Sequence, residues 1–201
     1  MPNWCYTNLN IHADKESIDL LDQKLDEAMN RTSDPSTTTD FGSRWLGNLL
    51  IASGYSEDDL NKEGVPCCRG EVEYYERTGS FGYVINITSA WSPQLGALVK
   101  FLEHLGIDAD ITYTAEELGM CLYVTNNPIE IDTFIVCDEE NYSTEYAYTE
   151  EMVKDLLIEK GCDYDEVIYL RTDELESYVS NHFEDLSIFR CEYAPVDEWC
   201  A

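Results

Sequence analysis

Few side chains in this sequence have the type and spacing of a catalytic group. The three histidines, His12, His104 and His182, lie far apart along the chain and offer no neighbouring pair for acid–base catalysis. The patterns H-E-x-x-H, G-x-S-x-G and G-x-G-x-x-G are missing, as is a phosphate-binding loop. We therefore expect structural or surface roles for the histidines, no enzymatic activity and no cofactor.

Carboxylates are abundant, with 41 Asp and Glu among 201 residues. At this density, pairs suited to acid–base catalysis occur by chance, so a pair does not indicate an active site. Asp163, Asp165 and Glu166 carry oxygens of the kind that calcium prefers, but the glycine and twelve-residue spacing of an EF-hand are missing. The sequence predicts weak, nonspecific calcium association there and no metal site.

The eight cysteines are spread along the chain without a C-x-x-C pair. No stretch approaches the roughly 18 apolar residues of a membrane span, and the first residues lack the features of a signal peptide. We therefore expect free thiols and a cytoplasmic location, in the cytoplasm of a host cell. The adjacent Cys67 and Cys68 leave a vicinal redox or metal site as a less favoured alternative.

The charge balance excludes several classes of partner. The net charge is −29 and the isoelectric point is near 4.1, while 44% of residues are hydrophobic, enough for a packed core. Binding to nucleic acid phosphates or to anionic lipid requires positive charge. The sequence predicts a folded, soluble, acidic protein that contacts neither nucleic acid nor membrane directly.

This charge is concentrated in the second half of the chain. Residues 1–100 carry 15 acids and 8 bases, whereas residues 101–201 carry 26 acids and only four bases. Self-repulsion of this strength costs folding free energy, so it usually has a use. Adaptation to salt would acidify both halves, which this sequence does not do.

The elements that would position these groups form two successive parts. Residues 1–127 are predicted to alternate strands and helices in the order β-α-insert-β-β-α-β with an extra strand, an α+β arrangement typical of a ferredoxin-like split β-α-β sandwich. The expected elements are strand 4–11, helix 17–29, a Ser/Thr-rich loop 31–40, a short helix near Trp45, a hairpin of 71–76 and 81–89, a helix capped by Ser92 and started by Pro93, and strands 111–113 and 120–124.

Asn126-Asn127-Pro128 marks the predicted boundary, and residues 128–201 form a smaller, acidic α/β C-terminal part. We expect a strand at 131–137, a helix from Thr149 to Gly161, a strand at 167–170 and a last helix from Thr172. The apolar stripe of that last helix is expected to include Leu186.

Two segments resemble a known family. Met1-Pro-Asn-Trp-Cys-Tyr-Thr-Asn8 and Thr88-Ser-Ala-Trp-Ser-Pro93 resemble the YubB-type ferredoxin-like family of phages and plasmids, and 113–119 (YTAEELG) looks like that family's strand after the second helix. The resemblance covers about residues 1–125. A Gly-Lys-Trp stretch common before the family's hairpin is replaced here by Cys67-Cys68-Arg69-Gly70. The resemblance implies a mobile-element origin and no catalytic residue.

A second pattern favours a different function. Phe81-Gly82-Tyr83-Val84 partly matches the aromatic strand with which RNA-recognition domains stack bases. Acids on the neighbouring strand would repel phosphate, so core aromatics of a hairpin are the favoured interpretation. RNA recognition stays open as the weaker alternative.

The acidic second half itself is the strongest functional signal. Glu151, Asp155 and Glu159 lie at helical spacing, with Cβ atoms about 5–6 Å apart along one face, comparable to the backbone charge spacing of duplex DNA. The hypothesis is a DNA mimic that enters the basic channel of a DNA-binding protein, namely a host restriction or CRISPR nuclease. The predicted partner-binding acids are Asp138, Glu139, Glu140, Glu145, Glu150, Glu151, Asp155, Glu159, Asp163, Asp165, Glu166, Asp173, Glu174, Glu184 and Asp185.

Two further interpretations of this half stay open. An acidic face that serves only solubility is about as well supported, and the protein is alternatively a protein-interaction adaptor of a phage or plasmid. Tyrosines would supply apolar anchors beside the charges, although most are expected in the core or on ordinary surface. These tyrosines are Tyr142, Tyr146, Tyr148, Tyr164 and Tyr169.

Overall fold

A computed structural model describes residues 3–30, 42–141 and 143–200. The predicted Ser/Thr-rich loop from Arg31 to Asp40 and the candidate anchor Tyr142 lie outside these residues. The helices are α1 (Lys15–Met29), α2 (Gly47–Ala52), α3 (Gly96–Leu105), α4 (Glu150–Glu159), α5 (Tyr164–Val167) and α6 (Thr172–His182). The strands are β1 (Trp4–His12), β2 (Gly70–Arg77), β3 (Gly82–Ala90), β4 (Asp110–Glu117), β5 (Leu122–Thr125), β6 (Phe134–Asp138), β7 (Ser143–Tyr148), β8 (Leu186–Arg190) and β9 (Glu192–Tyr193).

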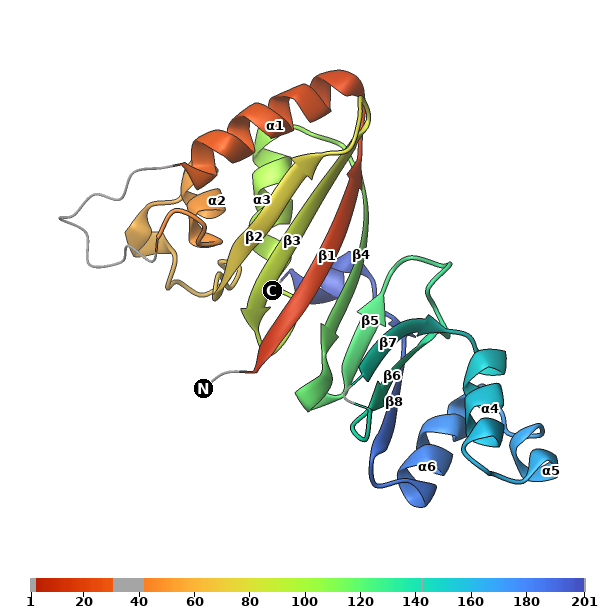
Figure 1. The fold of residues 1–201 in the computed structure, drawn as a ribbon. Coiled ribbons are helices and arrows are strands. Elements are labelled where there is room, and N and C mark those ends of the chain that lie inside the picture. Colours follow the sequence, from red (N-terminus) through yellow and green to blue (C-terminus); the bar gives the residue numbers. More distant parts are fainter. Residues whose placement is uncertain (1–2, 31–41, 142, 201) are drawn as a thin grey trace.

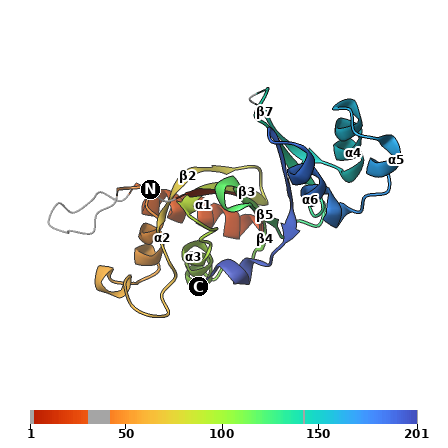
Figure 2. The same cartoon turned by 90° about the horizontal axis from the view of Figure 1, so that it is seen from below.

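The first part is built on a six-stranded sheet in the order β2-β3-β1-β4-β5-β9. Its first five strands pair antiparallel, and only β9 joins parallel, beside β5. Helices α1, α2 and α3 all lie on one face of this sheet, and the other face carries no helix (Figure 1; Figure 2). The fold is therefore mixed α+β with one covered and one open sheet face.

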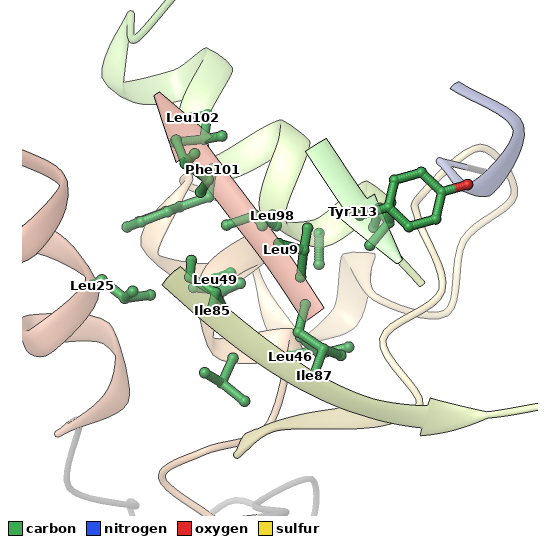
Figure 3. Close-up of a cluster of buried hydrophobic side chains, with 14 of the residues drawn as sticks. Leu9, Leu25, Leu46, Leu49, Ile85, Ile87, Leu98, Phe101, Leu102 and Tyr113 are labelled. Atoms are coloured by element: carbon green, nitrogen blue, oxygen red, sulfur yellow. The ribbon is translucent and has the colours of Figure 1, made fainter. Parts of the chain in front are cut away.

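Alternation along β1 explains why the two faces differ. Cys5, Leu9 and Ile11 are fully buried toward the helices, whereas Tyr6 and Asn8 point to the open side. A strand turns successive side chains to opposite faces, so this period of two fixes which face is covered. The helices supply the matching apolar surface; α1, for example, buries Ile18, Leu21 and Leu25 (Figure 3 shows the centre of the resulting core).

The second part is a three-stranded sheet, β7-β6-β8, with α4, α5 and α6 on one face (Figure 1). Its core is separate from the first and includes Phe134, Val153, Leu157 and Val179. Thr149 begins α4, because its side chain accepts a hydrogen bond from the Met152 backbone N–H at 3.3 Å.

The chain then returns to the first part. Cys191 and Ile135 form a small cluster with Tyr123, where the second sheet meets the end of the first. Beyond it, β9 pairs with β5, and the Tyr113 hydroxyl donates to the Ala194 carbonyl at 2.9 Å. Trp199 Nε1 donates to the same hydroxyl at 2.6 Å. Although they follow the expected boundary at 127, residues 192–200 pack against the first part.

Several predicted elements need correction. Helix α3 begins at Gly96, so Ser92 and Pro93 precede it and do not form its first turn. The expected strand 167–170 is wrong, because Val167 ends the four-residue helix α5. The assignment of Leu186 to the apolar stripe of the last helix is wrong, because Leu186 begins the strand β8. The strand predicted from residue 131 begins at Phe134. In the described residues, no helix is both long and apolar enough to cross a bilayer.

Candidate functional site

The four bases of residues 101–201 are all engaged by neighbouring acids. Lys154 Nζ lies 2.7 Å from Glu150 and Lys160 Nζ lies 2.8 Å from Asp138. Arg171 contacts both acids of the first turn of α6, and Arg190 pairs with the acid at position 132. No base of this half is therefore left to offset the remaining carboxylates.

One exposed row of acids runs along α4. Val153 and Leu157 lie on the side of this helix that packs in the second core, and Glu151, Asp155 and Glu159 lie on the solvent side. Residues four apart on a helix are neighbours on its surface, so these three carboxylates are adjacent. None of the three forms an ion pair with a described Lys or Arg, and all three are exposed at the predicted positions.

A second group of acids lies at α5. Asp163 begins this helix, because its Oδ1 accepts the backbone N–H of Asp165 at 2.9 Å and that of Glu166 at 3.3 Å. All three side chains are exposed. Their arrangement is that of an N-cap, and no group of three or more His, Cys, Asp or Glu in the described residues is placed to hold a metal ion.

The structure does not place every predicted partner-binding acid on the surface. Asp138 is only 8% exposed, and hydrogen bonds from Lys160 and Asn141 lower the pKa of its carboxyl to about 2. Glu150, Glu174 and Asp185 are half-buried, and the first two form ion pairs with Lys154 and Arg171. The exposed members are Glu139, Glu140, Glu145, Glu151, Asp155, Glu159, Asp163, Asp165, Glu166, Asp173 and Glu184.

Three of the candidate tyrosine anchors are exposed. Tyr146 of β7 is 54% exposed, Tyr164 of α5 is 59% exposed and Tyr169 is 81% exposed. Tyr148 is half-buried, and its hydroxyl donates to Glu145 at 2.5 Å. Tyr164, between the exposed Asp163 and Asp165, gives the acidic surface an apolar component, whereas the Tyr146 hydroxyl bonds to Glu116 of the first part.

The histidines lie on separate elements, His12 at the end of β1, His104 in α3 and His182 in α6. His182 stacks on the ring of Tyr178 with centroids 4.0 Å apart. Tyr83 of the RNA-recognition-like pattern is buried, with its hydroxyl donating to Asp22 at 2.9 Å, and burial raises its pKa. That ring is unavailable for base stacking.

All eight cysteines are free. Cys67 is exposed and Cys68 is half-buried. Burial raises the pKa of the Cys68 thiol to about 11, so this thiol is less ionised near neutral pH than an ordinary cysteine.

A second candidate site, which the sequence did not reveal, lies on the open sheet face. A pocket of about 840 Å³ extends from β1, β3 and β4 to β7, and Tyr6, Asn86, Glu116, Tyr123 and Tyr146 are among the residues that line it. Figure 2 shows β7 on the side of the large sheet that carries no helix. The sequence signal that could have revealed this pocket is the pair of asparagines at alternate positions of β1, because asparagine is uncommon in strands.

Glu116 is one of the carboxylates that line this pocket. Its Oε1 accepts a hydrogen bond from the Tyr146 hydroxyl at 3.1 Å, whereas its Oε2 is buried without a partner among the described residues. Burial raises the pKa of this carboxyl, and the bond from Tyr146 opposes the rise. Asn86 Oδ1 is likewise a buried acceptor without a partner among these residues.

Comparisons with known proteins found no matching family model, no matching curated protein and no matching solved structure.

Proposed function

We propose that this protein is a mobile-element inhibitor that mimics DNA and occupies the basic nucleic-acid channel of a host defence nuclease. The observation that carries the proposal is the state of the charges in the second half. Every base there is held by a local acid, while the row of Glu151, Asp155 and Glu159 has no basic partner among the described residues.

Electrostatic principles connect this surface to its partner. Acids at a spacing similar to that of DNA phosphates attract a channel lined with Lys and Arg, and such attraction accelerates association at low salt. Exposed rings such as Tyr164 and Tyr169 would bury apolar surface when the channel closes around them, which slows dissociation.

The proposed origin rests on the resemblance to the YubB-type family. The observed order β2-β3-β1-β4, with every neighbouring pair antiparallel, is consistent with a ferredoxin-like split β-α-β sandwich for the first part. In this proposal the first part is a scaffold for the acidic part, and the protein acts in the host cytoplasm.

The test compares two triple variants of equal charge change. The first carries Glu151→Lys, Asp155→Lys and Glu159→Lys; the control carries Asp58→Lys, Glu63→Lys and Asp108→Lys, three exposed acids of the first part. Each protein is titrated into DNA cleavage reactions of a panel of purified restriction and CRISPR nucleases, with circular dichroism as a check of folding.

We expect the wild type and the control to inhibit at least one nuclease, with inhibition weakened by salt and by added duplex DNA. The α4 variant should lose at least about tenfold in potency, equivalent to about 1.4 kcal/mol of binding free energy. Equal potency of the two variants would reject the α4 row as the contact. Failure of the wild type to inhibit any DNA-cleaving enzyme of the panel would reject the proposed function.

A further inference from the structure

The pocket on the open sheet face has an unusual balance of hydrogen-bonding groups. The described residues that line it include three carboxylates, Glu73, Glu116 and Glu130, and no Lys, Arg or His. Glu130 is already engaged, since the Thr114 hydroxyl and the Asn127 amide both donate to it. The charged side chains of this lining are therefore all acidic, so a cation would be attracted and an anion repelled.

Two of these acceptors are buried and unpartnered in the described structure. Asn86 Oδ1 and Glu116 Oε2 sit on the strands that flank β1, where Asn86 pairs opposite Asn8 and Glu116 opposite Tyr6. A buried acceptor without a donor costs free energy, and a buried carboxylate costs more unless it meets a cation. A cation with several N–H donors would satisfy both acceptors once these two side chains turn into the pocket.

Aromatic rings complete the walls. Tyr6 and Tyr123 line the pocket from the large sheet, and Tyr146 lines it from β7. Near Tyr146, β7 carries an extra residue relative to β6, and Ala147 has a left-handed φ of 58°. Bulges of this kind re-aim a side chain at functional sites. Here the Tyr146 hydroxyl reaches across to Glu116 and links the two parts of the molecule at the pocket.

We propose that this pocket binds a guanidinium group, presented either by a small molecule or by an arginine side chain. A guanidinium is planar, permanently charged and carries five N–H donors, so it can stack on a tyrosine face while donating to separate acceptors. A volume of about 840 Å³ leaves room for the rest of the ligand. This proposal does not depend on the acidic row of α4 or on nuclease inhibition.

The test is calorimetric titration of the full chain with three probes. They are methylguanidine, a capped tripeptide Ala-Arg-Ala and its lysine counterpart Ala-Lys-Ala. The lysine peptide measures the general attraction of any cation to a chain of net charge −29. Glu116→Gln is the site variant, and Glu63→Gln, an exposed acid outside the pocket, is the matched control. Asn86→Ser provides a second, uncharged change at the site.

We expect the arginine peptide to bind at least about tenfold more tightly than the lysine peptide, with a loss of about tenfold in Glu116→Gln and a smaller loss in Asn86→Ser. Glu63→Gln should bind as the wild type does. Methylguanidine binding as tightly as the arginine peptide identifies a small-molecule site, and a clear preference for the peptide identifies a protein partner. Equal binding of arginine and lysine peptides, or no effect of Glu116→Gln, would overturn the proposal.

Discussion

The two sheets of this protein are covered in opposite ways. The large sheet has helices on one face and a polar, open second face, whereas the small sheet has helices on one face and the first part of the chain against the other. Their cores also differ in size, since among the described residues the first cluster has 25 buried members and the second has nine. The small core belongs to the half of the chain that carries the excess negative charge.

The difference shows where each part obtains its stability. Buried apolar area is the main favourable contribution to folding, and like charges oppose it. The first part combines a large core with a milder charge. The second part has little core and strong repulsion, so its packing against Tyr123 and the return of the chain through β9 become important to it.

The largest expected effect comes from deleting core side chains. Leu157→Ala should lower the free energy of unfolding of the second part by about 2–5 kcal/mol, because it leaves a cavity in the smaller core. All four tryptophans, Trp4, Trp45, Trp91 and Trp199, belong to or pack on the first part. Tryptophan fluorescence therefore reports the first part, and circular dichroism reports both.

In Leu157→Ala, we expect the circular dichroism transition to move to lower denaturant concentration than the fluorescence transition. Leu98→Ala, in the first core, is the matched control and should shift the fluorescence transition. Coincident transitions in Leu157→Ala would show that the two cores unfold as one unit.

A smaller loss of free energy of unfolding is expected where Tyr113 contacts residues 194–199. Tyr113→Phe removes the hydroxyl that donates to the Ala194 carbonyl and accepts from Trp199 Nε1. Leaving these buried groups unpaired should cost about 1–3 kcal/mol. Carboxypeptidase should then release the last residues faster than from the wild type. An unchanged rate would show that Tyr113 does not hold this segment in place.

The ion pair of Asp138 with Lys160 should give a pH-dependent effect. The Asp138 carboxyl has a pKa of about 2 in the folded chain, against an ordinary 3.8. Its contribution to the free energy of unfolding is therefore complete above pH 3.8 and is lost as the pH falls through 2. Asp138→Asn should unfold at lower denaturant concentration near neutral pH and should match the wild type at about pH 2. A constant difference across this range would assign the effect to packing.

The smallest expected effect has the opposite sign. Burial raises the pKa of Glu116, so the folded chain holds this proton more tightly than the unfolded chain, and the charged form is destabilising near neutral pH. Glu116→Gln should therefore raise the unfolding midpoint slightly at pH 7, and the gain should disappear below the ordinary pKa of 4.5. A lower midpoint at pH 7 would show that the carboxylate is already compensated.

Sequence periodicity predicted the first part better than the second. The alternation of β1 and the spacing of Ile18, Leu21 and Leu25 are local signals, and the structure has the corresponding strand and helix. Leu186 was misassigned because a short strand and the end of a helix share the same apolar residues. The two-residue strand β9 has no periodicity of its own and exists only because β5 offers an edge.

The candidate sites differ in the same way. Charge is a property of the residues themselves, so the exposed row on α4 could be recognised from its spacing. The burial of Asp138 could not be predicted in this way, because it depends on Lys160, 22 positions further along the chain. The pocket on the open sheet face depends on the register of β1 with β3 and β4 and on a bulge in β7 near Ala147. These are long-range features.

The parallel pairing of β9 with β5 has a consequence for the order of folding. Parallel neighbours require a crossover connection, and here the whole of residues 126–191 forms that connection. Closing so long a loop costs entropy, so strands β1 to β4 can pair early, while β9 and Trp199 dock only after the acidic part has collapsed. During synthesis, the first core would stay incomplete until residues 192–199 have left the ribosome, so the N-terminal structure is completed late.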